Sequence, residues 1–283
     1  MPNLELVPKR DLSSFRRIAI GTWRTTYDPS VYGSMTLQMD QAMSYLEEFR
    51  EKTGRRLTLS HMMARAMAAV LAKMPDANAI LRWNRIYLRK DIGVFFQVAL
   101  EDDDTGEIDL SGATIHDAAN KSLLQILDEF EATVAKVRSK KDKQLESTRS
   151  MFKRIPFPFL NMVLDTIGFL SYGLNLDLRF LGIPKDPFGS VMVTNIGSLG
   201  LEEAYVPLVP YSRVPLLIAT GAVRERPVVR DGKVTVGKQM RLFATFDHRI
   251  LDGSHAAVMS KTLREWFENP YEHFDDLNAL PKS

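Results

Sequence analysis

The stretch Asp247-His248-Arg249-Ile250-Leu251-Asp252-Gly253 follows a strand-like run, 240–246, and precedes an amphipathic stretch. Apolar residues of that stretch fall on one helical face: Ala256, Met259, Leu263, Trp266 and Phe267. The pattern predicts a strand, a tight turn and a helix. His248 stands in the turn, where an imidazole that titrates near neutrality suits a general base. The turn equally suits a helix start capped by Asp252 or Ser254 beside an exposed His248, and taken alone it leaves both interpretations open.

A second element lies 54 positions before His248, where a short apolar strand that begins at Ser190 ends in Thr194-Asn195-Ile196-Gly197. Between the two elements come an apolar run, 216–219, and a stretch, 226–234, that contains Asp231-Gly232. Asp-Gly is a two-residue turn typical of β-hairpins. These segments therefore predict further strands of the same sheet.

Taken together and in this order, the motifs resemble the catalytic domain of the dihydrolipoamide acyltransferases of 2-oxoacid dehydrogenase complexes. They resemble chloramphenicol acetyltransferase more distantly. The resemblance implies an α+β fold with a mixed central sheet and flanking helices, and it implies acyl transfer between coenzyme A and a thiol or another small acceptor. His248 would then be the general base and the Thr194 hydroxyl the oxyanion donor, with direct transfer between the two bound substrates.

The resemblance also assigns roles around these two residues. The residue matching Asp252 forms a structural ion pair with an arginine in relatives, and Arg16, Arg17 and Arg249 are the candidates here. Asn195 is expected to orient its loop or to contact substrate. Gly253 is expected to allow a close backbone approach where the helix starts.

The first half of the chain fits the same α+β pattern. Alternation predicts a strand at 33–40, and Asp40 is expected to cap a helix that ends at Gly54. A second helix should run from Thr58 to Met74, because Pro75 ends it. Strands are expected at 85–89 and 92–99, and a helix at 120–137.

Composition agrees with a single globular enzyme domain over residues 1–283. Basic and acidic residues nearly balance, 37 against 35, which argues against nucleic acid as a partner. The chain has no cysteine, which excludes disulfides and thiolate nucleophiles. We expect a cytoplasmic protein, because the start lacks the apolar core of a signal peptide and no uncharged run approaches the ~20 residues that cross a bilayer.

The sequence shows neither a lipoyl domain nor a peripheral-subunit-binding domain. We therefore expect no covalently bound cofactor, acyl-CoA or CoA as substrate, and a lipoyl group presented in trans by a carrier protein. Relatives place the active site between subunits, which implies a homotrimer or a multiple of three. The alternative is a non-catalytic subunit that retains the fold.

Two segments depart from the family pattern. The acidic run from Glu101 to Asp109 fails as a calcium loop, because its twelfth position is Gly112 where an EF-hand needs Glu. No histidine outside the turn shows ligand spacing, so no metal site is indicated.

The other departure is an apolar insertion at about 149–188. Its front edge, 136–154, carries eight basic residues and two acidic ones. The insertion could contact a subunit, a membrane surface through 136–180, or an acyl chain. We expect it to select the acyl substrate through a cluster of Phe157, Phe159, Leu160, Leu164, Phe169 and Leu170.

Overall fold

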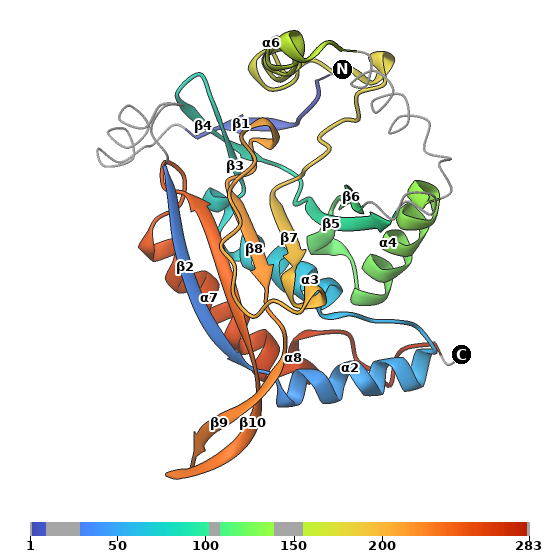
Figure 1. Cartoon of the computed structure of the whole chain (residues 1–283), viewed down its shortest axis with the longest axis vertical. Helices are drawn as coiled ribbons and strands as arrows, with labels where there is room; N and C mark the ends of the chain where they lie inside the picture. The colour runs from blue at the N-terminus through green and yellow to red at the C-terminus, as the bar shows by residue number, and fades with distance from the viewer. Residues whose placement is uncertain (1, 10–28, 102–107, 139–154, 282–283) are drawn as a thin grey trace.

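The computed structural model describes residues 2–9, 29–101, 108–138 and 155–281. Its centre is a mixed sheet in the order β2-β10-β8-β7-β5-β6, with β9 paired to β10 (Figure 1). The strands are β2 (Ser30–Gln38), β5 (Val94–Glu101), β6 (Ile108–Ile115), β7 (Val191–Asn195), β8 (Leu216–Thr220), β9 (Arg224–Arg230) and β10 (Lys233–Asp247). β7 runs parallel to β5 and β8, and the other pairs are antiparallel. The predicted α+β class is confirmed.

Helices cover one face of this sheet. They are α2 (Asp40–Thr53), α3 (Leu59–Lys73), α4 (Leu123–Arg138), α7 (Gly253–Glu268) and α8 (Pro270–His273). Figure 1 shows α3 and α7 behind the strands, and fully buried side chains such as Phe49, Met67 and Phe267 fill the space between. His61 of α3 lies in this core, and burial lowers its pKa to about 4.

The opposite face of the sheet carries a smaller apolar layer. Phe95, Met192, Leu217 and Phe243 form it, and the extended segment 204–208 packs against them. Tyr32 and Tyr205 meet edge to face over this layer, with ring centroids 5.7 Å apart, and both remain half-exposed. This face is therefore thinly covered in comparison with the opposite face, on which the helices pack.

Element boundaries follow the sequence closely, with one correction. The strand at 85–89 is β4 (Arg85–Arg89), and the Asp231-Gly232 turn has positive φ at both residues, as its hairpin type requires. Asp40, expected to cap α2, is instead its first residue. Its carboxylate is drawn away from the helix end, because it accepts from the Lys238 backbone N–H (3.1 Å) and pairs with Arg230.

A second, three-stranded sheet has the order β1-β4-β3, with β1 at Leu6–Pro8 and β3 at Ala79–Arg82. Beside it the insertion forms α6 (Phe157–Gly168), the π-helical turn η3 (Phe169–Gly173) and the short helix η4 (Arg179–Leu181). Ile167, Leu178 and Ile183 give the insertion a small core of its own. In the described residues, no helix has the length and apolar character needed to span a membrane.

Candidate functional site

His248 lies in the turn directly after β10, and two backbone bonds fix the turn. Its N–H donates to the Pro29 carbonyl (2.9 Å), and the Leu251 N–H donates back to the Asp247 carbonyl (2.9 Å). Nδ1 of His248 lies 2.8 Å from the Leu251 carbonyl oxygen. Because a carbonyl only accepts, Nδ1 carries the proton of the neutral ring and Nε2 keeps its lone pair. The geometry makes His248 an oriented proton acceptor.

The residues on either side hold that orientation. Nε and Nη2 of Arg249 donate to the Asp247 carboxylate, at 3.0 and 2.7 Å. Arg249 therefore forms an ion pair with Asp247, two residues before it. Asp252 caps α7, and it accepts from the Ser254 and His255 backbone N–H groups and from the Ser254 hydroxyl (2.6 Å). Burial alone would raise the pKa of Asp252, but these bonds and the His255 side chain outweigh it and hold that pKa well below its usual range.

The remaining candidates in this region are Arg16, Arg17 and Gly253. Arg16 and Arg17 lie outside the described residues, so their pairing with Asp252 stays a prediction. A Cβ added at Gly253 would meet no atom within 4 Å in the part of the chain that the structure describes. Gly253 therefore starts α7 without a close contact among these residues, and the close backbone approach expected there stays a prediction.

Thr194 lies near the end of β7, half-buried and in register with Ala219 of β8. Alternation along β7 places it on the face of Met192, which is the thinly covered one. Among the described residues, the Thr194 hydroxyl has no hydrogen-bond partner, while its carbonyl accepts from the Thr220 hydroxyl (3.4 Å). Asn195 accepts from the Ser198 N–H (3.1 Å) and so shapes the turn that follows. Of its two expected roles, Asn195 is seen in the orienting one.

One chain does not bring Thr194 and His248 together. Thr194 is level with Ala219 and, across β8, with Phe243 of β10, whereas His248 lies five residues farther along β10. At about 3.4 Å per residue and about 4.8 Å per strand, the two backbone positions are about 20 Å apart. They also lie toward opposite ends of the strands, because β7 and β10 run in opposite directions. A site that uses both side chains needs a second copy of the chain.

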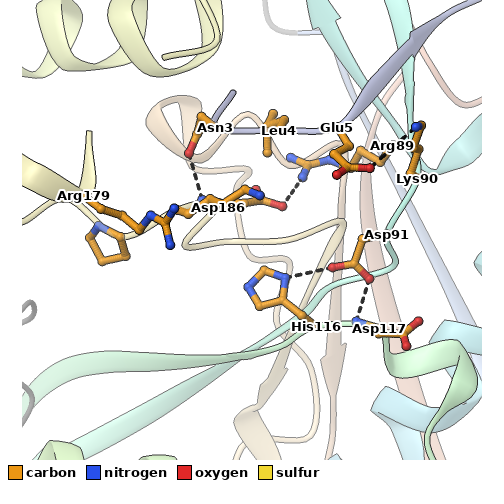
Figure 2. A pocket seen from close by; sticks show the side chains of 12 residues that line it. Asn3, Leu4, Glu5, Arg89, Lys90, Asp91, His116, Asp117, Arg179 and Asp186 are labelled. Carbon is orange, nitrogen blue, oxygen red and sulfur yellow. Dashed lines mark hydrogen bonds and ion pairs between the residues drawn. The ribbon is translucent and has the colours of Figure 1, made fainter. Parts of the chain in front are cut away.

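Figure 2 shows a polar pocket of about 730 Å³. It opens at the same end of the strands as His248. It lies where β5 begins and β6 ends, three strand positions from β10, or about 14 Å. The start of the chain, the ends of β4 and β6 and the insertion all contribute to it. The lining residues are Asn3, Leu4, Glu5, Arg89, Lys90, Asp91, His116, Asp117, Arg179, Pro184, Lys185 and Asp186.

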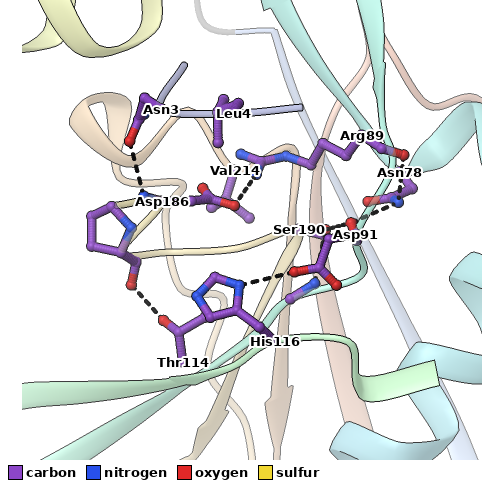
Figure 3. A network of polar contacts seen from close by, with 12 residues as sticks. Asn3, Leu4, Asn78, Arg89, Asp91, Thr114, His116, Asp186, Ser190 and Val214 are labelled. Atoms are coloured by element: carbon purple, nitrogen blue, oxygen red, sulfur yellow. Dashed lines mark hydrogen bonds and ion pairs between the residues drawn. The ribbon is translucent and has the colours of Figure 1, made fainter. Parts of the chain in front are cut away.

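Two polar pairs organise this pocket (Figure 3). His116 Nδ1 lies 3.0 Å from Asp91, whose other carboxylate oxygen accepts from the Asp117 N–H (2.6 Å). Partial burial would raise the pKa of Asp91, but these bonds outweigh it and lower that pKa. Arg89, with only 3% of its side chain exposed, pairs with Asp186.

The spacing of the histidines in the sequence predicts no role for His116. The signal that could have found the pair is the β5–β6 hairpin, whose antiparallel register places the open ends, and with them Asp91 and His116, side by side. Among the described residues, no group of three or more histidine or carboxylate side chains is placed to hold a metal ion.

The family model for the acyltransferase catalytic domain of 2-oxoacid dehydrogenases matches residues 13–153 and 188–274. A dihydrolipoyllysine-residue succinyltransferase component from Staphylococcus saprophyticus is 25% identical over 240 residues, or 83% of this chain and 45% of that protein. A dihydrolipoyllysine-residue acetyltransferase component from Bacillus subtilis is 23% identical over 78% of this chain and 44% of its own length. The chain thus spans less than half the length of these relatives.

Solved structures agree on the fold. A probable dihydrolipoamide acetyltransferase from Listeria monocytogenes superposes with a TM-score of 0.63 at 15% identity, over 98% of this chain and 99% of that one. The dihydrolipoamide acetyltransferase of Azotobacter vinelandii gives 0.62 at 20% identity, over 94% and 99%. That structure was studied for the catalytic roles of a serine, a histidine and an asparagine.

Proposed function

Because the chain belongs to the 2-oxoacid dehydrogenase acyltransferase family, whose catalytic-domain model matches more than half of it, we propose that it transfers acyl groups between coenzyme A and a thiol. The favoured thiol is dihydrolipoamide on a separate carrier protein, and another small acceptor is the alternative within this class. The observation that carries the proposal is the contact of His248 Nδ1 with the Leu251 carbonyl, which orients the ring and puts the lone pair of the neutral imidazole on Nε2.

Two side chains of the protein, His248 and Thr194, are enough to account for every proton and bond in the reaction. Nε2 of His248 takes the proton of the attacking thiol, and the thiolate adds to the thioester carbonyl. The Thr194 hydroxyl of a neighbouring subunit donates to the oxyanion of the tetrahedral intermediate. When the intermediate collapses, the other thiolate leaves and takes the proton back from His248. The acyl group thus moves between the two substrates, and the chain is unchanged at the end.

Motif spacing supports these roles. In the Azotobacter enzyme the serine precedes the histidine by 52 positions, and the asparagine follows it by four. Here Thr194 precedes His248 by 54 positions, and Asp252 follows it by four. Asp252 would act as a positioning residue, because its cap fixes the start of α7 directly after the Leu251 carbonyl that orients His248.

The test is to incubate the protein with a panel of acyl-CoAs and to follow free CoA with and without dihydrolipoamide. We expect CoA release that depends on the acceptor thiol. If a folded, oligomeric protein releases no CoA from any donor, the second candidate applies, which is a non-catalytic subunit that retains this fold.

We also propose a homotrimer or a multiple of three. The half-exposed Tyr32 and Tyr205, together with the exposed Leu199 and Leu201, leave an apolar surface on or beside the thinly covered face that carries Thr194. Exposed apolar surfaces of this kind mark contact sites. Light scattering is expected to give a mass that is a multiple of three chains, and a monodisperse monomer that is still active would contradict the interfacial site.

The insertion is also expected to contact a partner. The cluster expected to select acyl chains is divided in the structure, because Phe159 and Phe169 are exposed while Leu160, Leu164 and Leu170 are partly buried. The side chain of Phe157 lies outside the described residues. Of the partners expected for this region, a membrane surface fits outward-facing side chains better than an acyl chain, which needs an enclosing wall.

A further inference from the structure

An apolar tip stands at the end of the molecule that carries α6 (Figure 1). It combines Trp83, on the turn between β3 and β4, with exposed residues of the insertion. Phe180 is 80% exposed, and Met162 and Trp83 are each 60% exposed. The members of the apolar tip are Trp83, Phe159, Met162, Phe169, Leu174, Leu176, Phe180 and Leu181.

The two parts of the tip, which are the β3–β4 turn and the insertion, contact each other directly. The side chains of Arg82 and Trp83 both donate to the Gly173 carbonyl, at 2.7 and 2.9 Å. The Trp83 ring meets Phe169 edge to face at 5.8 Å. Trp83 has a φ of +52°, a conformation that costs a bulky residue energy and persists only where the surroundings impose it. The fold therefore holds a tryptophan outward at a strained turn.

The exposure of α6 is one-sided. Val163 and Ile167 turn inward against Leu178, Ile183 and the ring of Tyr211. Phe159, Met162 and Phe169, at helical spacing, face out. The helix thus has one packed face and a second apolar face that is exposed.

The charge around the apolar tip indicates what kind of partner it fits. Arg85 is exposed next to the Trp83 turn, and Arg179 is exposed beside Phe180, where it also pairs with Asp177. In the sequence, the stretch 136–154, which ends directly before Ile155, carries eight basic residues and two acidic ones. Tryptophan and phenylalanine rimmed by arginine suit the boundary between lipid headgroups and acyl chains. With 12 residues, α6 is about 18 Å long, enough to lie in that boundary and too short to cross a bilayer.

We propose that the apolar tip docks the protein on an anionic lipid surface. This deepens the expected membrane contact of 136–180, because it names the side chains and adds Trp83, which belongs to another part of the chain. Residues 154–187 lie between the two ranges matched by the family model, so the contact would be particular to chains with this insertion. It does not depend on acyl transfer and can be tested without it.

The experiment is co-sedimentation of the full chain with vesicles of phosphatidylcholine alone and with vesicles of equimolar phosphatidylcholine and phosphatidylglycerol. The variant replaces Phe159, Met162 and Phe180 with serine. The matched control replaces Val229, Val234 and Val236 with serine, because these are equally exposed and lie on the β9–β10 hairpin, which projects from the other end of the molecule (Figure 1). Circular dichroism and light scattering without lipid check the fold and mass of both variants.

We expect the parent and the control to bind the anionic vesicles, more weakly at high salt, and the tip variant to bind roughly a hundredfold less. Tryptophan fluorescence of the parent should be quenched by brominated lipid, and Trp83→Phe should reduce the quenching, because Trp83 is one of three tryptophans in the chain. A parent that binds neither vesicle, or a tip variant that binds like the parent, would overturn the proposal. A tip variant that dissociates to a smaller oligomer would make the tip a subunit contact instead.

Discussion

His248→Ala is expected to lower the rate of acyl transfer by about 10²–10⁴ while the fold and the oligomer stay intact. The loss follows from removing the proton acceptor, which is Nε2 of the ring that the Leu251 carbonyl orients through Nδ1. The turn itself should survive, since the Asp247–Arg249 pair and the Asp252 cap hold it without the imidazole.

The measurement is turnover with the best acyl-CoA and acceptor, beside circular dichroism and light scattering. His273→Ala is the matched control, since His273 stacks on Trp266 in the last helix and should retain the parent rate. Near-parent turnover by a folded His248→Ala protein would remove His248 from the reaction.

Thr194→Ala is expected to lower turnover by about 10²–10³ with little change in apparent affinity for acyl-CoA. The hydroxyl acts mainly on the oxyanion of the transition state, so its removal should affect kcat and spare KM. Thr194→Ser keeps the hydroxyl and should restore most of the rate. If KM alone rises, or if the serine variant is as slow as the alanine variant, Thr194 binds substrate or supports packing and is not the oxyanion donor.

The parts of the site that the sequence predicted are local ones. Apolar runs of period two, the Asp-Gly turn and the capping residue Asp252 follow from interactions within a few residues, and β10, its hairpin and the start of α7 appear where expected. The correction at Asp40 shows the limit of such reasoning. Its carboxylate bonds with the Lys238 backbone N–H and the Arg230 side chain, about 190 positions away, and does not cap its own helix.

Features that depend on contacts between distant parts of the chain could not be predicted from the sequence, and the reason is physical. The separation of Thr194 and His248 depends on β7 and β10 running in opposite directions with β8 between them, and no residue pattern encodes that order. The polar pocket likewise joins Asn3, Arg89, His116 and Asp186 through four distant segments. Trp83 stood in a turn that its own propensity disfavours, so only the contacts with Gly173 and Phe169 reveal why it is there.

The central claim is that a working site takes His248 from one subunit and Thr194 from another. The most direct measurement assembles mixed oligomers of the His248→Ala and Thr194→Ala proteins and compares their turnover with that of each variant alone. With random mixing in equal amounts, about one quarter of the sites regain both side chains, so turnover should recover to about that fraction of the parent rate. Mixed oligomers, verified by two different affinity tags, that stay as slow as the separate variants would contradict the account.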